Sequence, residues 1–298
     1  MKDDLVFVYG TLREGESNHG FMKGIERVAE QARTTGTLWD TGNGYPAMTV
    51  DNGSESFVYG EVYRIPEGGM DALDVLEDYY GPNDRRNEYE RISAAIQVDT
   101  GTLQAWTYIY KSEQIAGLTP IRCGDWKMNR LLDEGEEPSV PAKELFYFAY
   151  GSCMDDRRFL LQGVDRHFLN QAGRGVAKGY RLAFTYRATD GGRADIIETG
   201  GIVEGKLYRI GNEALAYLWQ REGVAAGSYR PAFIRVDSDE MKGKVEALTF
   251  IVLDKKEESS PPSWYLEEII RGAATVVSPA YFLQLKEMFR TRFGYEYC

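Results

Sequence analysis

Two short apolar runs, one near the start of the chain and one near its middle, end in the same way. Val6–Val8 leads into Tyr9-Gly10-Thr11, and Phe146–Ala149 leads into Tyr150-Gly151-Ser152. The β-branched and aromatic residues of such runs predict buried strands. The glycine then permits a turn and a close approach of the backbone to a ligand. We therefore expect several N–H groups at each turn to point one way and to suit a carboxylate or another oxygen-rich group.

The rest of the hydrophobic pattern predicts many short strands and few helices. In the first half, strands are expected at residues 33–40, 58–65, 89–97 and 103–110, a turn at 42–46, and helices at 17–30, 70–78 and 121–132. In the second half, strands are expected at 179–187, 202–210, 229–236 and 245–253, and helices at 155–171, 211–221, 263–273 and 279–290.

The two halves repeat each other in sequence. Tyr9 and Tyr150 are 141 residues apart, and the strand at 58–65 returns at 203–210 with a spacing of 145. Three more pairs follow in the same order, namely Glu77 with Glu222, Tyr89 with Tyr229, and residues 105–110 with 247–252. A nearly constant spacing over several elements indicates a tandem duplication.

An acidic stretch with two prolines, residues 132–142, separates the halves and is typical of an exposed linker. We expect domain 1 to span residues 1–137 and domain 2 to span residues 138–298. Each half has about six short strands and a central helix, which predicts an α+β fold of two small mixed β-barrels with flanking helices. A barrel of this size holds side chains or one small ligand. We expect the halves to pack as an intramolecular pseudo-dimer.

Charge and composition exclude several classes of function. The chain has 46 acidic and 35 basic residues and a net charge of −11, which argues against nucleic acid as a partner. Its three cysteines and two histidines are scattered, so no metal site is expected. There is neither a signal-peptide pattern nor an apolar run of about 18 residues. We therefore expect a cytoplasmic protein that contacts no membrane.

The two Tyr-Gly motifs continue as Tyr9-Gly-Thr-Leu-Arg13 and Tyr150-Gly-Ser-Cys-Met154. They resemble the signature of the gamma-glutamylcyclotransferase-like superfamily, whose Leu-Asp-x-x-Glu helix is matched by Leu73–Glu77 and, less faithfully, by Leu218–Glu222. The first half resembles the branch of the gamma-glutamylamine cyclotransferases, with further matches at residues 44–46 and 124–126. The second half resembles the gamma-glutamylcyclotransferases proper, with further matches at residues 261–266 and 272–273.

This resemblance implies an enzyme that needs no cofactor. In the family reaction, the α-amine of a gamma-glutamyl amide attacks the γ-carbonyl and releases 5-oxoproline and an amine. Glu77 and Glu222 would be the catalytic acid and base, and enclosure should raise their pKa values above the ordinary range. The small-molecule substrate would be bound by the two motifs and one further tyrosine, namely Tyr9, Gly10, Thr11, Leu12, Tyr110, Tyr150, Gly151, Ser152, Cys153 and Met154.

Other interpretations of these residues stay open. Tyr9 and Tyr150 could simply pack in the core, and a glutamate at a helix end is usually solvated. Cys153 replaces an asparagine of the family signature and Trp219 an aspartate, which indicates either an altered pocket or an inactive one. Either domain could instead be a non-catalytic binding module or a scaffold. The leaving amine should contact the loops at 79–88 and 188–199.

Overall fold

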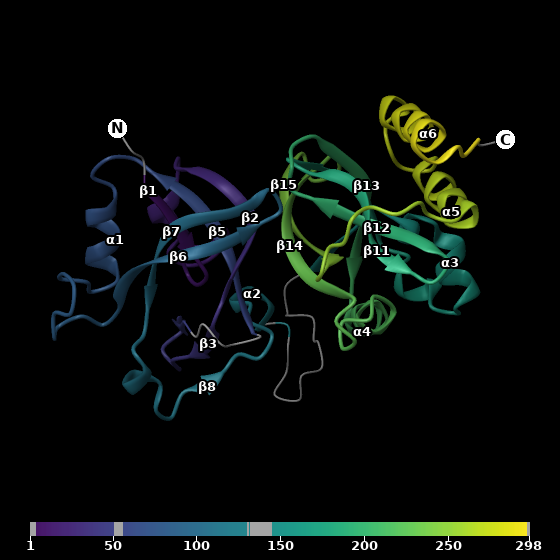
Figure 1. Cartoon of the computed structure of the whole chain (residues 1–298). Coiled ribbons are helices and arrows are strands. Elements are labelled where there is room, and N and C mark those ends of the chain that lie inside the picture. Colours follow the sequence, from purple (N-terminus) through teal and green to yellow (C-terminus); the bar gives the residue numbers. More distant parts are fainter. Residues whose placement is uncertain (1–3, 51–55, 130, 132–144, 297–298) are drawn as a thin grey trace. The chain divides into compact units, whose positions relative to one another are not determined.

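The computed structural model describes residues 4–50, 56–129, 131 and 145–296 (Figure 1). The chain divides into two compact units, residues 1–130 and residues 131–298, which we call domain 1 and domain 2. The boundary expected after residue 137, and the linker at 132–142, lie outside the described residues.

Five strands of domain 1 close into a barrel in the order β1-β5-β2-β6-β7. Strand β1 closes it, because β1 pairs with β5 in antiparallel fashion and with β7 in parallel fashion, where Val6 lies opposite Trp106. The strands are β1 (Asp4–Val8), β2 (Glu26–Thr35), β5 (Phe57–Ile65), β6 (Glu90–Val98) and β7 (Gly101–Ile109).

Domain 2 contains a second barrel of the same topology, with the order β10-β13-β9-β15-β14. Strand β9 takes the place of β1, because it pairs with β13 in antiparallel fashion and with β15 in parallel fashion. The expected duplication of an α+β barrel fold is therefore confirmed. The strands are β9 (Leu145–Ala149), β10 (Gln171–Lys178), β13 (Ile202–Ile210), β14 (Tyr229–Ser238) and β15 (Gly243–Val252).

Smaller elements flank the barrels. Domain 1 adds helices η1 (His19–Met22), α1 (Met70–Leu76), η2 (Ser112–Ile115) and α2 (Trp126–Asn129), and a small sheet of β3 (Thr37–Asp40), β4 (Pro46–Thr49) and β8 (Thr119–Pro120). Domain 2 adds the hairpin of β11 (Arg181–Ala188) and β12 (Gly191–Ile197), and helices η3 (Ser152–Met154), α3 (Asp156–Leu161), η4 (Asp165–His167), α4 (Asn212–Arg221), α5 (Ser263–Ala273) and α6 (Pro279–Phe293). Within the described residues, no helix combines the length and apolar character that crossing a bilayer requires.

A glycine in each barrel explains why one repeat element keeps its sequence. Gly60 on β5 and Gly205 on β13 lie beside the last residue of β1 and of β9. A Cβ atom at either glycine would approach the carbonyl oxygen of Val8 or Ala149 to 2.2 Å. Real Cβ atoms do not come so close to backbone, so only glycine lets these strands pack where the Tyr-Gly turns begin.

Several sequence-based expectations are wrong in detail. The helix expected at 17–30 is a single short turn followed by β2, because Gly24 adopts a φ of +82° that ends the turn. The strand expected at 33–40 is split by Gly36 into β2 and β3, and the helix expected at 155–171 stops before Gly163, which has a φ of +68°. Residues 171–178 form β10, and the loop expected at 188–199 contains β12.

The helix expected at the centre of the barrel instead lies beside it, as α1 does in domain 1 (Figure 1). Leu73 of α1 is buried, whereas Val75 is 79% exposed, so the helix packs by one face only. A barrel of five strands leaves room inside for side chains and none for a helix. The closing helix expected at 121–132 is likewise short, because Gly124 has a φ of +65° and lies against the backbone of Phe57.

Candidate active site

Each Tyr-Gly turn presents backbone N–H groups that lack an acceptor within the part of the chain that the structure describes. Among the described residues, nothing accepts a hydrogen bond from the N–H groups of Gly10, Thr11 or Leu12. The same holds, within the described part of domain 2, for Gly151, Ser152 and Cys153. Buried N–H groups are nearly always paired in folded proteins, so an unpaired run at the end of a strand marks a place for an oxygen-rich ligand.

A cavity of about 190 Å³ opens onto the first of these turns. The turn residues Gly10, Thr11 and Leu12 line it together with Glu77, which follows helix α1. Half of the remaining wall residues are aromatic, and they come from β1, β4, β7, the end of α1 and neighbouring loops. The remaining wall residues are Phe7, Val8, Tyr9, Asn18, Tyr45, Pro46, Leu76, Glu88, Tyr89 and Tyr108.

The Glu77 carboxyl group is partly buried in this cavity and has no hydrogen bond or ion pair with any described residue. Burial, with a smaller contribution from the negative charge of Glu88, raises the pKa of Glu77 to about 8. A carboxyl group with such a pKa exchanges its proton near neutral pH, as a general acid or base must. The surface interpretation of Glu77 therefore does not fit this structure.

Glu88 is a second carboxylate in the same cavity, and no motif of the sequence marks it as a site residue. Its Oε1 atom accepts hydrogen bonds from the hydroxyl groups of Tyr45 and Tyr110, each at 2.7 Å. Tyr110 itself is buried and is not part of the cavity wall, and it contacts the wall through Glu88 and through the ring of Tyr89, 4.6 Å away between centroids. Two features of the sequence could have indicated Glu88 as a site residue. It lies in the loop expected to contact the leaving amine, and it directly precedes Tyr89, which the second half repeats.

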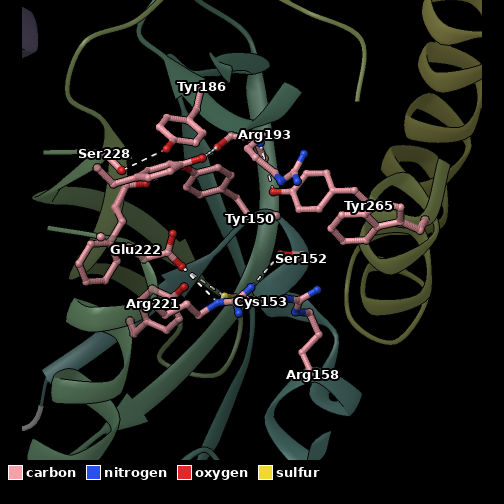
Figure 2. A pocket seen from close by; sticks show the side chains of 17 residues that line it. Tyr150, Ser152, Cys153, Arg158, Tyr186, Arg193, Arg221, Glu222, Ser228 and Tyr265 are labelled. Carbon is pink, nitrogen blue, oxygen red and sulfur yellow. Dashed lines mark hydrogen bonds and ion pairs between the residues drawn. The ribbon is translucent and has the colours of Figure 1, made fainter. Parts of the chain in front are cut away.

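Domain 2 has an equivalent cavity of about 270 Å³ (Figure 2). Gly151, Ser152 and Cys153 of the turn line it with Glu222, which follows helix α4. Met154 is fully buried beneath the turn, against Gly272 of α5, and is not part of the wall. The other lining residues are Tyr147, Tyr150, Arg158, Tyr186, Arg193, Ala194, Arg221, Gly223, Ser228, Tyr229, Phe250, Trp264 and Tyr265.

Glu222 meets a thiol and a guanidinium group inside this cavity (Figure 2). The Sγ atom of Cys153 donates to Glu222 Oε1 at 3.6 Å, and Arg221 Nε lies 3.4 Å from the same oxygen. Burial raises the pKa of Glu222, although Arg221 opposes this rise. Burial also raises the pKa of Cys153, so the residue is a thiol that donates a hydrogen bond and is a poor nucleophile.

The two signature tyrosines both pack in the core and line a cavity. Tyr9 donates a hydrogen bond to the carbonyl oxygen of Tyr108 at 2.8 Å, and Tyr150 donates to that of Phe250 at 2.5 Å. The acceptors are equivalent residues of β7 and β15. Each tyrosine therefore ties its turn to the neighbouring parallel strand.

Known proteins match the chain across both domains. The family described as "Gamma-glutamyl cyclotransferase, AIG2-like" matches residues 6–128, and the "AIG2-like family" matches residues 202–285. The Bacillus subtilis protein named "Putative gamma-glutamylcyclotransferase YkqA" is 40% identical over 284 residues, which are 95% of this chain and 96% of YkqA. The chain belongs to the gamma-glutamylcyclotransferase-like family.

Two further comparisons agree with this family. The crystal structure of YkqA is similar to the present structure with a TM-score of 0.84 and 38% identity, over 97% of this chain and 98% of that one. The Niallia circulans protein named "Gamma-L-glutamyl-butirosin B gamma-glutamyl cyclotransferase" is 42% identical over 126 residues, which are 42% of this chain and 77% of that protein. The resemblance drawn from the Tyr-Gly motifs is thus confirmed, while the roles of single residues stay predictions.

Domain 2 departs from the gamma-glutamylcyclotransferase signature in a coordinated way. In domain 1, the signature residue Asp74 accepts a hydrogen bond from the hydroxyl group of Tyr108 at 2.8 Å. In domain 2, Trp219 stands in place of the aspartate and Phe250 in place of the tyrosine. The two rings pack edge-on, with centroids 6.4 Å apart. An apolar pair thus replaces a polar pair beside the cavity. The cavity of domain 2 has a different chemical character at this place, and it is still present.

Ion pairs lie behind the turns in both domains, and the pair is buried in domain 1 but half-exposed at its acidic partner in domain 2. In domain 1, Arg13 lies 3.5 Å from Glu61 and 2.8 Å from Asp125, with side chains that are at most 5% exposed. In domain 2, Lys206 lies 2.6 Å from Asp156. Lys206 is the repeat equivalent of Glu61, so the two domains place opposite charges at corresponding positions.

Proposed function

We propose that both domains cleave gamma-glutamyl amides by intramolecular attack of the substrate α-amine, with Glu77 and Glu222 as the acid and base. The observation that supports this most strongly is the isolated Glu77 carboxyl group, which shares a cavity with three unpaired N–H groups. The carboxyl group can transfer protons, and the N–H groups can bind an anion. The Niallia circulans relative of domain 1 is named for the same reaction type on gamma-glutamyl-butirosin B.

Proton transfer sets the order of events in this mechanism. The glutamate carboxylate takes a proton from the α-ammonium group, and the freed amine attacks the γ-carbonyl carbon, forming the ring C–N bond. The unpaired N–H groups of the turn bind the substrate carboxylate or the oxyanion that forms. The bond to the leaving nitrogen then breaks. Two protons leave the attacking nitrogen and two reach the leaving amine, each carried by the glutamate.

Domain 2 also has a second candidate function, as a binding module without catalysis. The guanidinium group of Arg221 lies against Glu222 and competes for the carboxylate that the reaction needs. In domain 1 the residue before Glu77 is Leu76, which cannot compete in this way. Substitutions that inactivate one domain at a time distinguish catalysis from binding in domain 2.

The test measures 5-oxoproline release from a panel of gamma-glutamyl amides. We expect Glu77→Gln to remove the activity of domain 1, Glu222→Gln to remove that of domain 2, and the double variant to be inactive. Glu67→Gln and Glu213→Gln, which change exposed glutamates close to the same helices, are the matched controls. Activity that persists in the double variant would refute the assigned mechanism. An unchanged rate in Glu222→Gln, with calorimetric binding to domain 2, would establish the binding module.

A further inference from the structure

The two cavities carry opposite sets of charges. Among the described residues, the charged side chains that line the domain 1 cavity are Glu77 and Glu88. The domain 2 cavity contains one glutamate and three arginines, Arg158, Arg193 and Arg221. Glu88 and Ser228 are repeat equivalents, because each directly precedes the repeated tyrosine. The reaction acts on the gamma-glutamyl end, which all substrates share, so this difference concerns the leaving amine.

Glu88 is a carboxylate held in place without a cation. The hydroxyl groups of Tyr45 and Tyr110 both donate to Oε1, which fixes the side chain. No arginine or lysine among the described residues forms an ion pair with Glu88, and the nearby Lys111 pairs with Glu90 at 2.7 Å. A partly buried carboxylate usually has a cationic partner, and here the substrate can supply it.

Domain 2 reverses this arrangement. The Ser228 hydroxyl group lies 3.2 Å from that of Tyr186, and neither carries a charge that would repel an anion. Arg193 lies over the rings of Trp264 and Tyr265, at 5.0 and 5.1 Å from their centroids (Figure 2). Arg158 pairs with Glu268 and Arg193 with Asp190, but these two acids lie outside the cavity wall. The wall of the domain 2 cavity therefore has three basic side chains and one acidic one.

We propose that Glu88 makes domain 1 select gamma-glutamyl amides whose leaving amine carries a second, positively charged group, whereas domain 2 favours a leaving amine that carries a carboxylate. This inference rests on the function proposed above, because it names the substrate class of the same cavities. Glu88 acts as a specificity residue: it contacts the distant end of the leaving amine and takes no proton from the reacting nitrogen.

The test uses three amides of equal length that differ in terminal charge. They are the gamma-glutamyl amides of 1,5-diaminopentane, pentylamine and 5-aminopentanoate, which are cationic, neutral and anionic at that end. Domain 1 is measured in the full chain with Glu222→Gln, and domain 2 in the full chain with Glu77→Gln. We expect kcat/KM of domain 1 to fall from the cationic to the anionic amide, and that of domain 2 to follow the reverse order.

Glu88→Gln in the Glu222→Gln background tests the residue itself. We expect about a tenfold loss of kcat/KM for the cationic amide, as for a hydrogen bond to a charged group, and little change for the neutral one. The acid limb of the pH profile should also move to lower pH, because the charge that helps to raise the pKa of Glu77 is gone. Glu113→Gln, an exposed change in η2, is the control. An equal loss for all three amides would overturn the proposal.

Failure of the proposed function gives a different result. If no variant releases 5-oxoproline, calorimetry with the glutaryl amides of the same three amines reports charge preference without reaction, since these lack the α-amine. Weaker binding of the cationic glutaryl amide alone in Glu88→Gln would support the selectivity even then. Equal affinities of wild type and Glu88→Gln for all three analogues would overturn it.

Discussion

Glu77→Gln should stabilise domain 1, and the gain should grow with pH. The pKa of Glu77 rises from about 4.5 in the unfolded chain to about 8 in the fold. Between these values the unfolded chain binds fewer protons than the folded one, so the free energy of unfolding falls as pH rises. Glutamine has nearly the same shape and no charge, and it removes this penalty.

The magnitude follows from the size of the pKa shift. One pKa unit corresponds to about 1.4 kcal/mol, so the penalty grows by about 4 kcal/mol between pH 5 and pH 8 for a site without water. The cavity is open to solvent, which reduces this to about 2 kcal/mol. At pH 5 the free energies of unfolding of wild type and variant should differ little. Glu77 is protonated in the fold at this pH, and pH 5 lies close to the pKa of about 4.5 in the unfolded chain.

Hydrogen exchange measured by mass spectrometry suits this test, because a chain with two domains does not unfold in one step. Peptides from β1 and β5 report on domain 1, and peptides from β9 and β13 in the same molecule are the internal control. We expect slower exchange in the domain 1 strands of Glu77→Gln at pH 8, after correction for the intrinsic rate, and no change in domain 2. A gain that is equal at pH 5 and pH 8 would refute the argument.

Four further predictions concern the reaction and the fold. The acid limb of kcat/KM for domain 1 should lie near pH 8, the pKa of Glu77, and a limb near pH 4.5 would contradict the burial argument. Gly60→Ala should destabilise domain 1 by more than about 2 kcal/mol, measured by hydrogen exchange of its strands, because the new Cβ atom meets the Val8 carbonyl oxygen, whereas Gly20→Ala has open space around it. Glu61→Gln should cost about 3 kcal/mol by leaving Arg13 partly unpaired, and a near-zero cost would show that water enters the pair. Cys153→Ala should keep most of the domain 2 activity, because the raised pKa of Cys153 makes it a poor nucleophile, and loss of all turnover would contradict this.

The family motifs in the sequence were sufficient to locate the turns and the two glutamates that line the cavities, because each lies within a few residues of its motif, while the catalytic roles stay predictions. Glu77 directly follows the helix whose apolar face fixes its direction, and Gly10 follows the strand that it ends. Glu88 and Arg193 could not be found in this way. Glu88 depends on Tyr45 and Tyr110, which are brought together by strand pairing, and Arg193 lies on β12 in a stretch that has turn-forming residues at both ends.

The wrong expectations have a common physical origin. Residues 26–30 have the composition of a helix, yet their backbone pairs with β5, so a tertiary contact decides against the local preference. The same applies to residues 171–178, which pair with β13 to complete the second barrel. Strand partners more than twenty residues away leave little trace in a local pattern.

The opposite charges behind the two turns bear on how a duplicated chain avoids exchanging strands between its two domains. Two similar halves in one chain can exchange strands while they fold, which is a known hazard of tandem repeats. If β9 took the place of β1 against β5, Asp156 would face Glu61, and in the reverse exchange Arg13 would face Lys206. Each hybrid would bring like charges together where the native pairing joins opposite ones, and this difference favours the native pairing of strands.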